Sequence, residues 1–97
     1  MLRHVVLLRF TPQATPAAVA AAVDALRTLP DSIDAIVGYE VGVDAGLAED
    51  NASLVVLAEF ADAEGWRRYQ EHPDHQRVLA EHLRPILAQR LAVQFET

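Results

Sequence analysis

Two short segments of this chain are apolar at both odd and even positions, which makes them candidates for the centre of a sheet. Residues 3–10 read R-H-V-V-L-L-R-F, and residues 53–60 read S-L-V-V-L-A-E-F. Successive side chains of a strand point to opposite faces, so each segment would present apolar groups on both sides. A strand that is covered on both faces has this composition. We therefore predict that these segments are the two central strands.

Two further segments alternate between apolar and polar residues. The first spans residues 33–44, and its apolar face consists of Val37, Tyr39, Val41 and Val43. The second spans residues 90–96 and sets an apolar face against a polar one: Leu91, Val93 and Phe95 against Arg90, Gln94 and Glu96. Because a single apolar face is typical of an outer strand, we predict the two sheet edges here. Residues 45–51, with a glycine and three polar or acidic residues, predict a loop.

A first helix is predicted from Thr15 to Pro30. Thr15 is a favourable N-cap, and Pro16 suits the first helical position, where a backbone N–H would have no partner. Apolar residues then recur at helical spacing: Val19, Ala22, Val23, Leu26 and Leu29. We expect this helix to be scaffold that packs on the sheet.

A second, broken helix contains the most distinctive stretch of the chain, W-R-R-Y-Q-E-H-P-D-H-Q at residues 66–76. Asp62 is a plausible N-cap, and Trp66 and Tyr69 lie one turn apart on the face predicted to point inward. Pro73 has no N–H and disfavours a helical conformation at the residue before it, so the first helix should end there and a second begin. The resumed helix has an inward stripe and is kinked or ended by Pro85: Val78, Leu79, Leu83, Ile86 and Leu87.

His75 falls in the first turn of the resumed helix. The unpaired backbone N–H groups and the helix dipole place partial positive charge near its imidazole, which favours the neutral form. A neutral imidazole can accept a proton. We therefore treat His75 as the first candidate for acid–base chemistry.

The predicted order is strand, helix, strand, strand, broken helix, strand within a single domain over residues 1–97. This is the α+β, ferredoxin-like arrangement, in which a four-stranded antiparallel sheet has the order 4-1-3-2 and the two-sided strands lie in the middle. Helices of this length cover only one face of such a sheet. The other apolar face then needs a partner, and an identical subunit is the simplest one, so we predict a homodimer through the sheet faces.

Composition and charge narrow the function classes. The net charge of −6 and pI near 5.0 argue against a nucleic-acid surface, which needs clustered positive charge. The chain has no cysteine, which excludes disulfides and thiolate chemistry. We see no basic-then-apolar leader and no apolar run long enough to span a bilayer, so we expect a cytoplasmic protein without a membrane partner. No glycine-rich phosphate loop is present, and we expect no cofactor.

Three segments together resemble the Dabb family, the stress-responsive dimeric α/β-barrel domain. They are H-V-V-L-L-R-F at the start, the strand with Gly38 and Tyr39, and Y-Q-E-H-P-D-H-Q-R-V at residues 69–78. The resemblance covers nearly the whole chain, and the Y-x-x-H-P-x-H segment is its most specific part. It implies ferredoxin-like subunits that pair sheet to sheet as a dimeric barrel, with a pocket between sheet and helices. Related barrels include small monooxygenases and lactone isomerases.

The family also includes plant polyketide cyclases, in which a tyrosine and a histidine of this motif flank the reacting carbon. The resemblance therefore implies that Tyr69 and His75 are the reacting pair and that His4 is their neighbour on a strand. Where the plant cyclases have a histidine near the start of the third strand, this chain has Leu54. That departure weighs against the same cyclisation.

The remaining candidates have a structural and a functional interpretation. Trp66 would form a pocket wall or part of the core, and His72 would touch a ligand or cap the helix break. His72 and His75 have the H-x-x-H spacing of metal ligands, but the proline between them breaks the helix and no third ligand matches, so we expect no metal.

Two functions remain open from the sequence. In the first, a dimeric barrel binds a small, largely apolar, oxygen-bearing molecule, and Tyr69 and His75 carry out acid–base chemistry of the cyclase, isomerase or lyase kind. In the second, the chain is a non-catalytic, stress-related oligomeric or interaction domain without a substrate. Oxygenation without a cofactor, as in related small barrels, is a third possibility. The sequence does not decide whether the protein is an enzyme.

Overall fold

The computed structural model describes residues 1–97 and contains one four-stranded sheet with helices. The elements in chain order are β1 (Leu2–Phe10), α1 (Pro16–Ser32), β2 (Gly38–Val43), β3 (Leu54–Phe60), α2 (Ala63–Glu71), α3 (Pro73–Val78), η1 (Leu79–Leu83), η2 (Arg84–Ile86) and β4 (Leu87–Glu96). The sheet order is β2-β3-β1-β4 and every neighbouring pair is antiparallel. The ferredoxin-like fold and the two central strands predicted from the sequence are confirmed.

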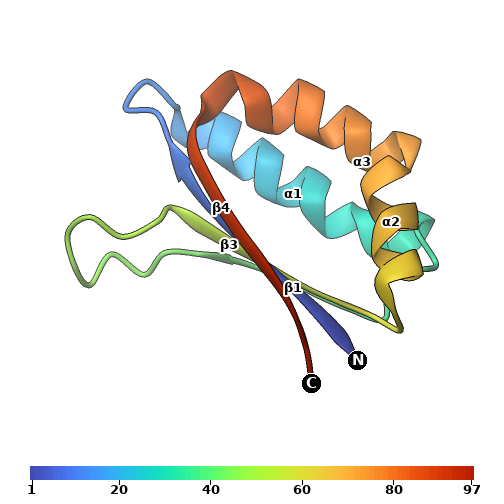
Figure 1. The fold of residues 1–97 in the computed structure, drawn as a ribbon. Coiled ribbons are helices and arrows are strands. Elements are labelled where there is room, and N and C mark those ends of the chain that lie inside the picture. The colour runs from blue at the N-terminus through green and yellow to red at the C-terminus, as the bar shows by residue number, and fades with distance from the viewer.

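All the helices lie on one side of the sheet. Figure 1 shows α1 and the path from α3 to β4 running side by side above the strands, with α2 crossing at one end. The two chain ends meet below, because β1 and β4 are neighbours and the Thr97 N–H donates to the Met1 carbonyl at 3.0 Å. The molecule therefore has two layers, and one sheet face has no covering layer. None of the helices combines the length and hydropathy that crossing a bilayer requires.

The covered face of the sheet holds the core. Alternate residues of β1 and β3 are buried there: Leu2, His4, Val6 and Leu8, with Leu54, Val56, Ala58 and Phe60. The predicted stripe of α1 packs on them through Ala22, Val23, Leu26 and Leu29. Burial of each large aliphatic side chain contributes roughly 1.5–3 kcal/mol, so these positions determine which sheet face the helices cover.

The helix starts follow the predicted capping residues. The Thr15 hydroxyl accepts a hydrogen bond from the Ala18 N–H at 3.1 Å, and the Asp62 carboxylate accepts one from the Gly65 N–H at 2.9 Å. Each bond satisfies a backbone donor that has no partner within the helix.

Three predicted boundaries were wrong by two residues or more. The last strand, β4, begins at Leu87 rather than at residue 90, so Leu87 belongs to the strand and not to the helical stripe. α1 continues past Pro30 to Ser32, since a proline this close to the helix end removes only one backbone hydrogen bond. The second strand begins at Gly38 rather than at residue 33. Ile33 is instead the C-cap of α1. Its N–H donates to the Leu29 carbonyl at 2.9 Å, so this buried residue ends the helix and does not belong to the strand.

The other sheet face remains open and apolar. Five large hydrophobic side chains on it are substantially exposed: Leu7 40%, Leu57 38%, Leu91 65%, Val93 53% and Phe95 43%. They are contiguous, because Leu7 pairs with Leu91 and Val5 pairs with both Val93 and Leu57. An exposed apolar patch of this kind marks an interaction surface.

Candidate functional site

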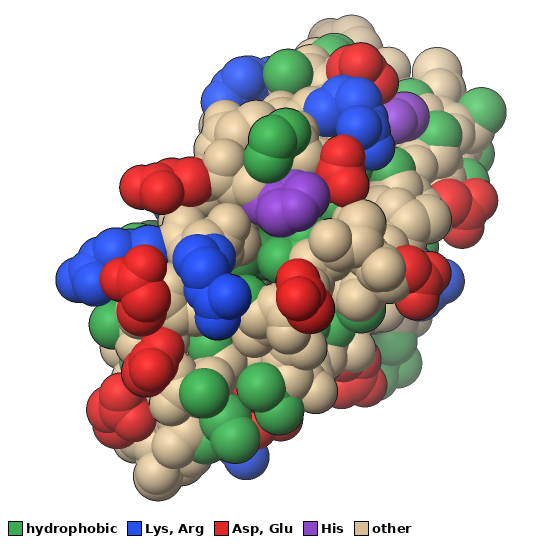
Figure 2. Space-filling model, turned by 90° about the vertical axis from the view of Figure 1, so that its right-hand side faces the viewer, with side chains coloured by type: hydrophobic (Ala, Val, Ile, Leu, Met, Phe, Trp, Pro, Cys, Tyr) green, Lys and Arg blue, Asp and Glu red, His purple; other side chains and the backbone are tan.

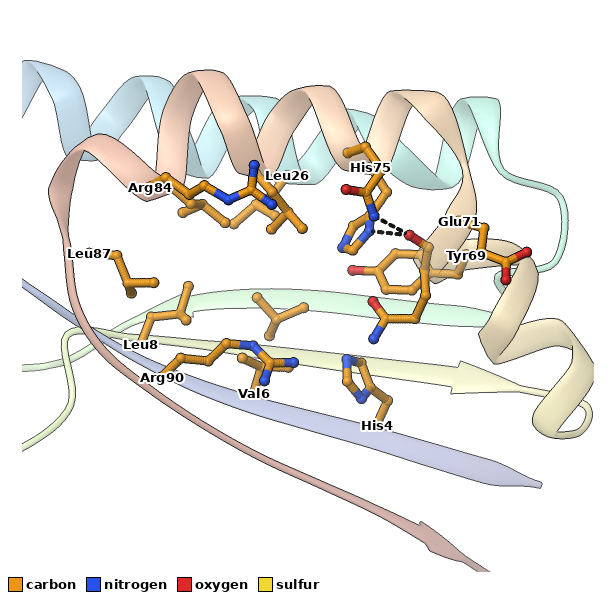
Figure 3. A pocket seen from close by; sticks show the side chains of 15 residues that line it. His4, Val6, Leu8, Leu26, Tyr69, Glu71, His75, Arg84, Leu87 and Arg90 are labelled. Carbon is orange, nitrogen blue, oxygen red and sulfur yellow. Dashed lines mark hydrogen bonds between the residues drawn. The ribbon is translucent and has the colours of Figure 1, made fainter.

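A cavity of about 550 Å³ lies between the covered sheet face and the helices. Figure 3 shows His75 and Tyr69 entering it from the helical layer, opposite His4, Val6 and Arg90 on the strands. Aliphatic side chains form much of the wall: Val6, Leu8, Leu26, Val56, Leu83 and Leu87. A mainly apolar cavity of this size with a few polar groups is suited to a small organic ligand.

The break between α2 and α3 determines which ring nitrogen of His75 carries the proton. The Gln70 carbonyl lies in the last turn of α2, where carbonyls have no partner within the helix. It accepts a hydrogen bond from Gln76 Nε2 at 2.5 Å and lies 3.4 Å from His75 Nδ1. A carbonyl can only accept, so Nδ1 carries the proton and Nε2 is left as an acceptor. Figure 3 shows the second ring nitrogen pointing into the cavity.

His75 is buried, with 5% of its surface exposed. Burial lowers its pKa below the usual 6.5, and the Gln70 carbonyl opposes this shift by favouring the protonated ring. The neutral form is therefore favoured, in the direction predicted from the helix start, but burial is its main cause. A neutral imidazole with a free Nε2 is a competent proton acceptor at pH 7.

Tyr69 is paired with a residue that the sequence did not single out. Its hydroxyl lies 3.0 Å from the Tyr39 hydroxyl on β2, and its ring centroid lies 4.1 Å from that of His75. Burial raises the pKa of both tyrosines, so both are neutral and can donate hydrogen bonds. When Tyr39 donates to Tyr69, the Tyr69 proton is free for a third group.

His4 has a fixed partner on the neighbouring strand. His4 and Gln94 are directly opposite in the β1–β4 register, and Gln94 Nε2 donates to His4 Nδ1 at 2.8 Å. An amide nitrogen only donates, so the proton of His4 is on Nε2. Burial, with a smaller contribution from the positive charge of Arg90, lowers the pKa of His4 to about 4. His4 is thus a neutral donor in the cavity wall.

The profile of the Dabb family, described as the stress responsive A/B barrel domain, matches residues 2–97. The chain belongs to the Dabb family. A search of curated proteins finds no match.

Solved structures with this fold span a wide range of sequence identity to this Dabb domain. A dimeric ferredoxin-like protein of unknown function from Thermobifida fusca YX is 41% identical, with a TM-score of 0.91 and coverage of 99% of this chain and 90% of that chain. A Dabb family protein with a ferredoxin-like fold from Mesorhizobium loti is 23% identical, with a TM-score of 0.80 and coverage of 99% and 95%. A hydroxynitrile lyase from Passiflora edulis is 14% identical, with a TM-score of 0.83 and coverage of 97% and 90%. The last two show the shared fold alone.

Of the five predicted site residues in this Dabb domain, three line the cavity and two do not. Tyr69, His75 and His4 are brought together. Trp66 is half-buried outside the lining, where its ring meets the His4 ring edge-on at 6.2 Å between centroids. His72 caps α3, since its Nδ1 accepts from the Asp74 N–H at 3.1 Å.

The sequence analysis also did not select several groups that line the cavity or hold its lining residues from outside it. Tyr39 completes the tyrosine pair, Gln94 positions His4, and Arg84, Arg90 and Glu71 bring charge to the lining. Alternation along residues 90–96 placed Arg90 and Gln94 on one face, but gave no sign that this face is the covered one. No group of three histidine, aspartate or glutamate side chains is arranged to hold a metal ion.

Proposed function

We propose that this Dabb domain is a homodimer whose subunits each bind a small, largely apolar, oxygen-bearing molecule and carry out proton transfer on it through His75. The single observation that supports the chemistry is the neutral His75 ring, with Nδ1 held by the Gln70 carbonyl and Nε2 facing the cavity. A neutral proton acceptor with a perturbed pKa in an apolar cavity is typical of acid–base catalysis.

The homodimer part of the proposal is supported by the open sheet face. Its exposed apolar side chains form one contiguous surface, and a second copy would cover them with an identical surface about a twofold axis. The relative from Thermobifida fusca, at 41% identity, is described as dimeric.

The proton transfer would use three residues in different roles. His75 Nε2 takes a proton from a carbon next to a carbonyl, or from a hydroxyl, and becomes positively charged. The Tyr69 hydroxyl donates to the substrate oxygen as negative charge develops there, supported by Tyr39 at 3.0 Å. His4 Nε2–H is a second donor from the sheet side.

The reaction class that fits this arrangement is a lyase, isomerase or cyclase reaction without a cofactor. Each begins with removal of a proton and formation of an oxyanion, which are the two tasks that these residues can perform. The hydroxynitrile lyase with the same fold supports a lyase reaction in a protein of this shape.

A non-catalytic oligomeric domain is the second candidate. The cap formed by His72 and the hydrogen bond between the two tyrosines stabilise the fold whether or not a substrate binds. In that case the cavity would have no preferred occupant.

The test uses simple ketones as probes. Thermal-shift titration with 4-phenyl-2-butanone and ethyl acetoacetate should show saturable stabilisation, and NMR in heavy water should show faster exchange of the hydrogens next to the carbonyl. His75→Gln should slow this exchange by about 10²–10⁴-fold while the melting temperature stays within about 2 °C. Saturable binding with no exchange would remove the catalytic role, and no saturable binding would favour the non-catalytic domain.

His82→Gln is the matched control. His82 is a half-buried histidine in η1 that does not line the cavity, so its loss should leave exchange at the wild-type rate.

A further inference from the structure

We propose that the ligand of this cavity carries a carboxylate, which is bound by Arg90 and Arg84. The inference rests on the proposed function in assuming that the cavity holds a ligand, and it adds the chemical class of that ligand. Its foundation is a pair of guanidinium groups in the cavity lining that have no partner within the protein.

The two arginines come from adjacent parts of the chain. Arg84 belongs to η2, and Arg90 pairs with Leu8 in the β1–β4 register, which directs its side chain to the covered face. Figure 3 shows the two guanidinium groups on opposite sides of the cavity, with Leu87 and Leu8 at the same end. A ligand lying between the helices and the sheet would have one arginine on each side.

Neither guanidinium forms a hydrogen bond or an ion pair with the rest of the chain. Most of the other arginines do, with either a carboxylate or a backbone carbonyl: Arg3, Arg9, Arg27, Arg67 and Arg77. The protein is acidic overall, with a net charge of −6, so carboxylates are abundant. Both cavity arginines are exposed, as is Arg68, which also has no partner, so the donors of Arg84 and Arg90 are open to solvent or to a bound anion.

The positive charge of Arg90 also acts on the reacting groups. It adds to the lowering of the pKa of His4 and His75 that burial causes, and it opposes the rise that burial causes in the pKa of Tyr69, because a neighbouring cation disfavours protonated imidazole and favours phenolate. Its guanidinium therefore shares the same cavity with all three. A ligand held by Arg90 would lie in the cavity that His75 also lines.

A single carboxylate suits the site better than a more highly charged group. The planar guanidinium donates two parallel hydrogen bonds to a carboxylate. The wall around the arginines is aliphatic, and Glu71, also in the lining, would repel a second negative charge. The ligand we infer has an apolar body, one carboxylate at the arginine end, and its reacting oxygen near Tyr69 and His75.

The experiment compares acids with their neutral amides. 4-Phenylbutyrate and octanoate should bind the wild-type protein about tenfold more tightly than 4-phenylbutanamide and octanamide, as measured by calorimetry at pH 7.5, because the amide loses the charge-assisted bonds. Arg90→Gln should remove most of this preference, and Arg84→Gln a smaller part.

Arg68→Gln is the matched control. Arg68 is an exposed arginine of α2 outside the cavity, so its replacement makes the same change in net charge and should keep the tenfold preference. Inorganic phosphate should bind more weakly than the acids, since it has no apolar body.

Five results would overturn the inference. Equal binding of acids and amides would leave the proposed ligand pocket in place but remove the carboxylate. A preference that survives both cavity variants, or falls as much in Arg68→Gln, would place the effect elsewhere. Phosphate binding as tight as that of the acids would indicate a general anion site. Failure of all these probes and of the neutral ketones to bind would remove the ligand pocket itself.

Discussion

The two faces of this sheet are built from the same strands but differ in which side chains are buried and which are exposed. On the covered face, the buried side chains of His4 and Tyr69 have partners: Gln94 donates to His4, and the Tyr39 and Tyr69 hydroxyls meet at 3.0 Å. On the open face, apolar residues such as Leu57 and Val93 are exposed, and the one ion pair, Arg3 with Glu59, lies at an end of the strands.

This contrast separates the two parts of the proposed function. Buried polar groups are costly unless they are paired, and in the proposed function the paired groups of the covered layer are those positioned for a ligand. The exposed apolar groups of the open face have no such positioning. They would stabilise a dimer through the apolar area that assembly removes from water. The covered face would serve chemistry and the open face assembly. Figure 2, which views the molecule from the α2 end, shows acidic and basic side chains interspersed there.

The largest effect is expected on the open face. Leu57→Asp places a charge in the middle of the apolar surface, where a second subunit would bury it without a partner. Such burial costs several kcal/mol, so the dimer should weaken by roughly a hundredfold or more in sedimentation equilibrium.

Ala21→Asp is the control for this variant. It adds the same charge at an exposed position of α1, in the other layer, and should leave the dimer intact. A wild-type protein that remains monomeric at high concentration would contradict the proposed role of the open face.

The next effect concerns the neutral histidine of the covered face. The pKa of His4 is about 4 in the folded protein against 6.5 for an unperturbed ring. As the pH falls below 6.5, the unfolded chain binds this proton and the folded chain does not, so stability present above pH 6.5 is lost down to about pH 4. The loss should reach roughly 3 kcal/mol in urea denaturation.

His4→Gln should remove most of that pH dependence while keeping a polar group opposite Gln94. His75, whose pKa is also lowered by burial, would account for part of what remains. If the wild-type slope between pH 6.5 and 4 persists in His4→Gln, then His4 is not buried in its neutral form.

The smallest effect tests whether the two tyrosines act as a pair. Tyr39→Phe and Tyr69→Phe should each lower the free energy of unfolding by about 1–2 kcal/mol, because each leaves the other hydroxyl without its partner. The double variant should be less destabilised than the sum of the two, with a coupling of about 1 kcal/mol in urea denaturation. Additive effects would show that the hydroxyls are independent.

The two edge strands show where sequence patterns stop being informative. Both β2 and β4 alternate, and both were correctly predicted as edges. In β2 the apolar residues Tyr39 and Val41 face the helices, whereas in β4 it is the polar residues Arg90 and Gln94 that do so. Alternation separates two faces of a strand, but it does not say which face the helices cover.

The sequence alone determined the element types, the helix starts at Thr15 and Asp62, the break at Pro73 and the sheet order, since all of these follow from local propensity and from the periodicity of apolar residues. Only the tertiary structure decided which side chains meet at the candidate site. Tyr39 and Tyr69 are 30 residues apart, and His4 and Gln94 are 90 apart. Their contacts depend on strand register and on how the helical layer packs, which no local pattern encodes.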